Sequence, residues 1–449
     1  MSFLTKEAVS YLNTIDMLKK GDKKLIGAWA FYDWANSVYS LVIGTAIFPI
    51  YFNSVTGGND SLVTFLGEEF NNATLYSYAL SFSFLMVVFL SPVLSSVADY
   101  LGNKKRFLQF FCSLGSFSVA CLYFFTGENI EIGILFMVLA SIGFWGSLVF
   151  YNAYLVEIAH PKDHDSVSAK GFIYGYLGSV LLLLLCLFLQ MNPALFGIID
   201  ASLPARLSFL MVGLWWFGFA QYTFYHLPKN SPGKQLKKNI IFKGFKELRK
   251  VLRELKHLVE LKLFLVSFFL YSVGVQTIIL IASLFGDKEL NLETEKLIVT
   301  ILLIQLIAIV GAALFSKLSK RIGNIKTLKI IIFGWGLITV GAYMLDKDNA
   351  NVTLQFYILG GFLGMVLGAI QSISRSTYSK LIPEETKDTA TYFSFYDVTE
   401  KVAIVLGTFI SGLTIALTGS MKASVLILAG FFFAGFIVLS FLKKTKYVL

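Results

Sequence analysis

Apolar residues fall in twelve long stretches separated by short polar segments, and this pattern predicts twelve membrane-spanning helices. A helix of about 20 apolar residues is long enough to cross the hydrocarbon core of a bilayer. We therefore expect an all-α polytopic membrane protein. The predicted spans are residues 27–52, 74–98, 106–126, 131–158, 169–191, 206–227, 263–285, 296–318, 326–346, 352–380, 390–417 and 422–442.

The basic residues between these spans are distributed unequally. If the chain starts inside, 31 of the 38 lysines and arginines lie in the segments and helix ends on that side. Basic residues concentrate on the cytoplasmic side of membrane proteins, so both termini are predicted to be cytoplasmic. The formal net charge of +10 therefore reflects topology, and no nucleic-acid partner is indicated.

Composition leads to the same class of protein. Apolar residues make up 56% of the chain and charged residues only 15%, so a soluble fold could not cover its own apolar surface. The expected partners are the lipid bilayer and a small solute, in a bacterial cytoplasmic membrane and with the protein as a monomer. Three cysteines inside spans, without paired spacing, predict neither disulfide nor metal site, and no cofactor is expected.

A polar, basic segment divides the spans into two sets of six. Residues 228–262 hold 11 basic and 3 acidic residues, and apolar positions from Leu248 to Val259 repeat with helical period. This indicates an amphipathic helix on anionic headgroups, with a regulatory docking site as the alternative. The predicted units are a cytoplasmic segment, a bundle, the linker, a second bundle and a tail: residues 1–26, 27–227, 228–262, 263–442 and 443–449.

The segment after the second span is weakly repeated after the eighth, where Gly323 and Asn324 match Gly102 and Asn103. It resembles the loop signature of the major facilitator superfamily, although Ser95 and Tyr100 depart from that pattern. The resemblance implies two six-helix bundles and a gating role for the matching residues. In the second copy Lys320 stands in place of the aspartate, which argues against a symmetrical gate. The gating candidates here are Asp99, Gly102, Lys104 and Arg106, joined by Asp397 and Lys401 in the eleventh span.

Two longer stretches narrow the resemblance. Residues 29–37, WAFYDWANS, with Thr45–Pro49, are similar to the first helix of the vacuole-effluxer-like branch, named for autophagy-related amino-acid exporters. Residues 371–376, QSISRS, and 395–401, FYDVTEK, resemble its tenth and eleventh helices. This resemblance implies a permease for small solutes, with neutral amino acids as one candidate class.

Ionisable side chains within spans are costly, so each is a functional candidate. They are Asp33, Glu157, Arg375, Asp397, Glu400 and Lys401, which helix rise places in one layer of the cytoplasmic half. Asp397 and Lys401 are spaced to neutralise each other. That leaves Asp33, Glu157 and Glu400 as proton-coupling candidates, with Arg375 expected to pair with Asp33. The layer is interpreted either as a gate of salt bridges or as a solute site in which Arg375 holds a carboxylate.

Polar stripes on the first, fourth, seventh and tenth spans predict a central cavity, since these spans line it in the proteins that the chain resembles. The predicted function is secondary active transport of a small organic solute by alternating access, with proton coupling. The alternative is a transporter-like sensor or scaffold. Hydrolase and nucleotide-binding motifs are absent from the sequence, so no enzyme is expected. The substrate-binding candidates are Asp33, Asn36, Tyr151, Tyr154, Gln276, Gln371 and Arg375.

Overall fold

A computed structural model describes residues 20–58, 61–228 and 240–442. Most of the predicted N-terminal segment, the start of the linker and the tail at 443–449 lie outside these residues. Within the described chain, twelve helices are long and apolar enough to cross a membrane. They correspond in number and order to the predicted spans.

The helices of the first half are joined by short connections. A continuous first span comprises α2 (Lys23–Val38), a π-helical segment (Tyr39–Ile47) and α3 (Phe48–Val55). The other spans of this half are α4 (Asn72–Leu101), α5 (Lys104–Cys121), α6 (Ile130–Ile158), α7 (His164–Met191) and α8 (Leu203–His226). Short 3-10 turns occupy Leu122–Phe124, Pro161–Asp163 and Pro193–Phe196.

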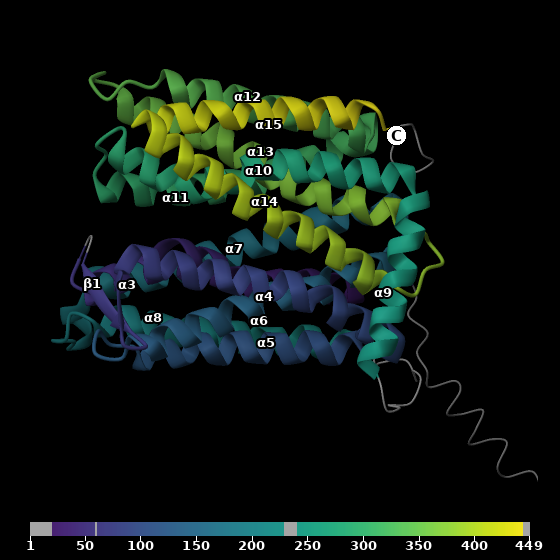
Figure 1. Ribbon diagram of the computed structural model, residues 1–449, viewed down its shortest axis with the longest axis horizontal. Helices are drawn as coiled ribbons and strands as arrows, with labels where there is room; N and C mark the ends of the chain where they lie inside the picture. The colour runs from purple at the N-terminus through teal and green to yellow at the C-terminus, as the bar shows by residue number, and fades with distance from the viewer. Residues whose placement is uncertain (1–19, 59–60, 229–239, 443–449) are drawn as a thin grey trace, which may run out of the picture.

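The second half begins with the linker helix α9 (Ile240–His257). Its spans are α10 (Val259–Lys288), α11 (Thr294–Ile322), α12 (Asn324–Met344), α13 (Val352–Leu381), α14 (Thr389–Thr418) and α15 (Met421–Ser440). Figure 1 shows α2–α8 on one side of the molecule and α10–α15 on the other, with α9 crossing one end of both. We call α2–α8 the N-group, α10–α15 the C-group, and the end that carries α9 the linker end.

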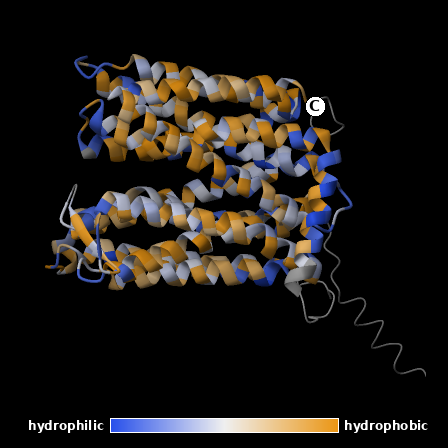
Figure 2. Cartoon of the chain, in the orientation of Figure 1, coloured by the Kyte–Doolittle hydropathy of each residue, from blue (hydrophilic) through white to orange (hydrophobic). Residues whose placement is uncertain are grey.

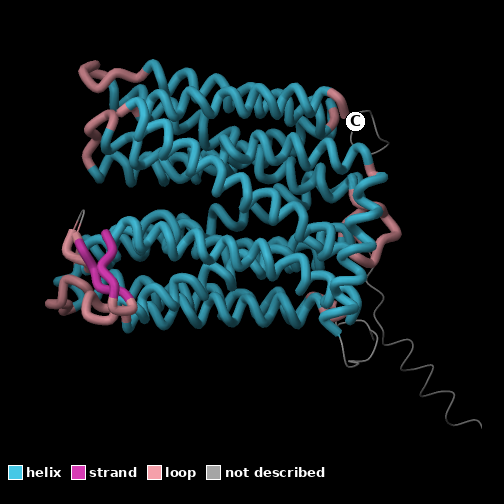
Figure 3. Tube along the Cα trace, viewed as in Figure 1, coloured by secondary structure: helices cyan, strands magenta, loops and turns pink. Residues whose placement is uncertain are grey.

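The connection between the first two spans contains a structure that the sequence did not predict. Strands β1 (Leu62–Phe65) and β2 (Glu68–Asn71) form an antiparallel hairpin. Leu66 and Gly67 both have positive φ, of 52° and 88°, which suits a two-residue turn. The side-chain amide of Asn72 donates to Asn53, Thr56 and Gly58, and so ties the hairpin to the end of α3. Figure 3 places the hairpin opposite α9, and we call this the hairpin end.

Side chains on the outer faces are apolar, as lipid requires. Figure 2 shows apolar residues along the helices and hydrophilic residues mainly at the two ends. Large exposed apolar side chains include Phe89, Phe362 and Leu417. Within the C-group, α13 approaches α11 closely at glycine: a Cβ added at Gly368 would lie 2.0 Å from the Ala308 carbonyl oxygen. Gly360 and Gly364 of α13 likewise face Thr300 and Ile304 of α11, so these glycines pack the two helices together, as small residues do in membranes.

Helix α9 contacts the protein more closely than a helix lying on headgroups would. Val251 is fully buried, and a Cβ added at Gly244 would meet the Val97 side chain of α4. On the other side, Lys250 Nζ lies 2.8 Å from Asp388 Oδ2, just before α14. This ion pair raises the pKa of Lys250, mainly through the hydrogen bond to Asp388. The linker helix thus connects the two groups.

Candidate functional site

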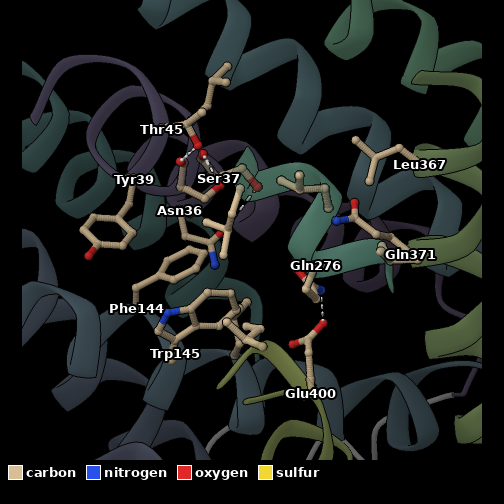
Figure 4. A pocket seen from close by; sticks show the side chains of 18 of the residues that line it. Asn36, Ser37, Tyr39, Thr45, Phe144, Trp145, Gln276, Leu367, Gln371 and Glu400 are labelled. Atoms are coloured by element: carbon tan, nitrogen blue, oxygen red, sulfur yellow. Dashed lines mark hydrogen bonds between the residues drawn. The ribbon is translucent and has the colours of Figure 1, made fainter. Parts of the chain in front are cut away.

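A cavity of about 290 Å³ lies between the N-group and the C-group. Its lining runs from Asp33 and Arg375, in the linker-end halves of the first span and α13, to Thr45 and Tyr76, in the hairpin-end halves of the first span and α4. Figure 4 shows amide, carboxylate and aromatic side chains from both groups around this space. The predicted residues that line it are Asp33, Asn36, Gln276, Gln371, Arg375 and Glu400.

Asp33 and Arg375 form an ion pair across the two groups, as the sequence predicted. Arg375 Nη1 lies 3.3 Å from Asp33 Oδ2. The guanidinium also donates to Ser168, from Nε to the hydroxyl at 2.9 Å and from Nη2 to the carbonyl at 2.8 Å. Its face lies 4.1 Å from the Phe172 ring centroid. Most of the donors of Arg375 are therefore used within the protein, which holds α2, α7 and α13 together.

Tyr151 supports this pair from behind the cavity wall. Its hydroxyl donates to Asp33 Oδ2 at 2.8 Å, and its ring stacks on Trp29 with centroids 4.5 Å apart. The indole of Trp29 in turn donates to the Tyr151 carbonyl oxygen. Tyr151 and Tyr154 are both buried, and neither is among the described residues that line the cavity. Tyr151 therefore positions Asp33 in this conformation.

A second charged cluster lies on α14. Lys401 is fully buried, with Nζ 3.0 Å from Asp397 Oδ1 and 2.9 Å from Glu400 Oε2. The predicted Asp397–Lys401 pair is thus present, and Lys401 also pairs with Glu400, one of the proton-coupling candidates. Glu400 also accepts from Gln276 Nε2 at 2.8 Å, and Lys401 lies 3.5 Å from the Trp145 ring centroid. We call Asp397, Glu400 and Lys401 the α14 triad.

Glu157 belongs to a third cluster, at the linker end. Lys104 makes an ion pair with Glu157 and lies 3.1 Å from Asp99. The C-group joins through the start of α14: Thr389 donates to Glu157, and the Thr391 backbone N–H donates to Asp99 at 2.7 Å. The intramembrane charges therefore do not form the single layer that helix rise predicted.

We call Asp99, Lys104, Glu157, Thr389 and Thr391 the Asp99 cluster, and Gly102 forms the turn that follows Asp99. Gly102 ends α4 with a φ of 65°, a left-handed conformation that suits glycine. Arg106, the remaining gating candidate, is exposed on the first turns of α5. The positions of Asp99, Lys104 and Gly102 fit the gating role expected from the loop signature, while Arg106 is exposed beside the cluster.

Sequence reasoning missed a fourth cluster, which also joins the two groups at the linker end. The carboxylate of Asp165 on α7 accepts hydrogen bonds of 2.8 Å from Lys380 Nζ, Asn324 Nδ2 and Ser319 Oγ, all in the C-group. Asn324 belongs to the repeated Gly-Asn segment, where the missing aspartate argued against a symmetrical gate. The N-group supplies the carboxylate instead. The repeat could have located one side of this cluster, but no sequence spacing connects it to Asp165.

Comparison with known proteins identifies the family. Residues 21–447 match the model of the family described as vacuole effluxer Atg22 like. The chain belongs to this family. It is 31% identical over 430 residues to an uncharacterized MFS-type transporter, YxiO, from Bacillus subtilis, with 95% of this chain and 96% of that protein covered. It is 25% identical to autophagy-related protein 22 of Pichia angusta, with 84% and 76% covered.

Solved structures of major facilitator superfamily transporters share the fold. FucP, in its outward conformation, matches with a TM-score of 0.67 at 13% identity, covering 95% of this chain and 99% of that one. The proton:xylose symporter XylE matches with a TM-score of 0.67 at 14% identity, covering 98% of both chains. The family and the fold make this an integral membrane protein of the MFS transporter type.

The described residues contain no group of three or more histidine, cysteine, aspartate or glutamate side chains arranged to hold a metal ion. Cys112, Cys121 and Cys186 are free thiols within or at the end of spans. The charged clusters described above are therefore ion-paired networks. Three of the four, all except the α14 triad, make hydrogen bonds or ion pairs that join the N-group to the C-group.

Proposed function

We propose that the protein moves a small organic solute across the membrane by alternating access. One observation carries this proposal: the central cavity extends toward the hairpin end, while polar clusters join the two groups at the linker end. Rocking of one bundle against the other would break these clusters and open the cavity on the opposite side. The moving units would be residues 27–227 and 263–442, acting as a monomer.

Neutral amino acids are the solute class that we propose to test first. Support comes from the family, which includes autophagy-related protein 22, and from amide side chains on the cavity wall. We further propose proton coupling, because Asp33 and Glu400 line the cavity and an acid there could take up a proton as the clusters rearrange. Glu157 is the weaker candidate, since it lies in the Asp99 cluster.

We propose that the linker end faces the cytoplasm, because most basic residues lie on that side. The proposed location is a bacterial cytoplasmic membrane, in line with the similarity to the Bacillus protein. Labelling of single cysteines with an impermeant maleimide in intact cells tests this orientation. If cysteines in α9 reacted with the maleimide while cysteines in the hairpin were protected, the linker end would face the outside of the cell instead.

Counterflow in sealed liposomes tests transport itself. Liposomes preloaded with a mixture of unlabelled neutral amino acids receive labelled members outside, and we expect accumulation with the wild type. Arg375→Ala is expected to abolish it, because the variant removes the ion pair and the hydrogen bonds that join α2, α7 and α13. Arg206→Ala is the matched control, since Arg206 pairs with Asp200 near the hairpin end. Accumulation that survives in Arg375→Ala would contradict the role of the pair.

One observation favours a second function, that of a solute sensor. Helix α9 contacts both α4 and the start of α14, so a rearrangement of the groups would move it. The same liposomes separate the two functions. A sensor would bind solute without net movement across the bilayer, whereas a transporter accumulates it.

A further inference from the structure

The charged side chains on the cavity wall differ in how exposed they are and in whether an opposite charge neutralises them. Among the described residues, the charged side chains that line the cavity are Asp33, Arg375 and Glu400. Asp33 and Arg375 neutralise each other and are only 5% and 4% exposed. The Glu400 side chain is 19% exposed. Glu400 is therefore the charged group that a solute in the cavity can reach.

Glu400 also belongs to a cluster with more acids than bases. In the α14 triad, two carboxylates share one ammonium, that of the fully buried Lys401. With all three groups ionised, the triad carries one excess negative charge. In a cavity of low polarity, such a charge is stabilised by a nearby cation. Lys401 cannot supply a second one, because its side chain is already shared.

The geometry around Glu400 leaves room for that cation. One carboxylate oxygen accepts from Gln276 and the other from Lys401, yet each oxygen has two lone pairs. Tyr271 and Tyr396 also line the cavity. Aromatic faces attract ammonium groups through the ring quadrupole, so carboxylate and rings favour the same kind of ligand.

Amide side chains also line the cavity. Asn36 on α2 is fully buried, so it lies behind the cavity surface, whereas Gln371 on α13 is half-buried. Gln371 accepts from the Tyr176 hydroxyl through its amide oxygen, so its amide nitrogen is the donor end. Figure 4 shows Gln371 and Glu400 beside the same space, with Asn36 on its other side. A solute with a cationic end and an oxygen acceptor would satisfy both Glu400 and Gln371.

We infer that Glu400 binds the protonated amine of the transported solute, with the amide nitrogen of Gln371 donating to its oxygen. The inference rests on the proposed transport function and names the substrate class: a small amine, either free or zwitterionic. Gln276 is the positioning residue, because its hydrogen bond fixes the carboxylate. Arg375, whose guanidinium is engaged by Asp33 and Ser168, holds the two groups together and does not receive the solute in this conformation.

Matched pairs of compounds test this inference by binding alone. The probes are isoamylamine beside isoamyl alcohol, and L-leucine beside its 2-hydroxy analogue, added to the purified protein in micelles. The concentration dependence of the thermal midpoint gives an apparent Kd for each compound. At neutral pH we expect at least one amine to bind about tenfold more tightly than its hydroxyl partner, as charge-assisted hydrogen bonds require. Glu400→Gln is expected to remove the difference.

Two further variants make the result specific. Glu131→Gln neutralises an exposed carboxylate at the start of α6 and is expected to keep the amine preference. Glu400→Asp keeps the charge of the triad but withdraws the carboxylate by one methylene, so amine affinity is expected to fall and hydroxyl affinity to stay constant. This variant also tests the inference if Glu400→Gln fails to fold.

The inference is overturned if no amine binds, if amines and hydroxyl partners bind equally, or if Glu400→Gln keeps the preference. Counterflow of the same compounds separates this outcome from failure of the proposed function. Amine preference without counterflow would leave Glu400 as a binding residue in a protein that does not transport these solutes. Counterflow without amine preference would leave transport standing and remove the role of Glu400.

Discussion

Replacement of Asp165 by asparagine is the sharpest test of how the linker end is held closed. The Asp165 and Lys380 side chains are 2% and 5% exposed, and they come from different groups. Asparagine keeps the size of the side chain but removes its charge. Lys380 would then be a buried cation without a carboxylate partner while the two groups remain in contact.

The expected free-energy cost of Asp165→Asn follows from the burial of this ion pair. Removing one partner of a buried ion pair costs roughly 3–5 kcal/mol. The lower figure applies here, because Lys380 Nζ also donates to Asn324 Oδ1 at 2.8 Å and keeps that hydrogen bond. The cost falls on the conformation that is closed at the linker end, since the contact joins the two groups. About 3 kcal/mol corresponds to a shift of roughly 100-fold in the equilibrium between conformations.

Cysteine labelling measures this shift. Thr45 lines the cavity toward the hairpin end, so Thr45→Cys reports access from that end in a background without native cysteines. We expect Asp165→Asn to slow its reaction with an impermeant maleimide. Asp200→Asn is the control. Asp200 is 53% exposed near the hairpin end, and its ion pair with Arg206 lies within the N-group, so it does not join the N-group to the C-group.

An unchanged labelling rate in folded Asp165→Asn protein would refute this reasoning. The double variant Asp165→Asn with Lys380→Met adds a second criterion. It removes both charges and leaves no unpaired cation, so we expect a smaller shift than in the single variant. A double variant with a shift equal to the sum of the two single variants would show that the pair is not coupled.

Three further predictions concern helix packing, the ion pair of Arg375 and the linker helix. Gly368→Val is expected to lower the thermal midpoint strongly, because its Cβ would overlap a carbonyl oxygen of α11, whereas Gly430→Ala, with open space around it, leaves the midpoint unchanged. Arg375→Lys keeps the charge but loses the guanidinium fork, so counterflow is expected to fall about tenfold or more. Lys250→Ala is expected to cost at most about 1 kcal/mol in a denaturation assay, since Lys250 is half exposed and solvent screens its pair with Asp388. The raised pKa of Lys250 means that this contribution is present at neutral pH and is lost only as the pH rises through that pKa.

The spans could be predicted from sequence because each is a long apolar run bounded by polar residues. The hairpin could not, since β1 and β2 are four residues each and Glu68 and Glu69 interrupt any apolar alternation. The π-helical segment at Tyr39–Ile47 was also missed. It changes the hydrogen-bond register of the first span while leaving its apolar composition continuous, so hydropathy carries no signal for it.

The site was predicted in part for a similar reason. Membrane burial makes Asp33 and Arg375 visible as costly charges. Their pairing was a hypothesis, because four acids and two bases in the spans do not by themselves select Asp33 as the partner of Arg375. Glu157 was expected in the same layer as the other charges, but it stands one residue before the end of α6, at the linker end, where it pairs with Lys104 of α5. Asp165 was overlooked because it stands near a predicted connection, where charges are expected. Its burial depends on the approach of the other group.

The two clusters at the linker end differ in where their ion pairs lie, and this difference predicts unequal roles. Asp165–Lys380 joins the N-group to the C-group, as does Asp33–Arg375. In the Asp99 cluster the ion pairs of Lys104 stay within the N-group.

There the C-group contributes neutral donors, including the Thr391 backbone N–H at the start of α14. Asp99→Asn should therefore leave Lys104 paired with Glu157 and cost only a hydrogen bond or two, about 1–3 kcal/mol. In the Thr45→Cys assay we expect a smaller change for Asp99→Asn than for Asp165→Asn. The reverse order would mean that the contact between α4 and α14, and not the buried ion pair between α7 and α13, holds the linker end closed.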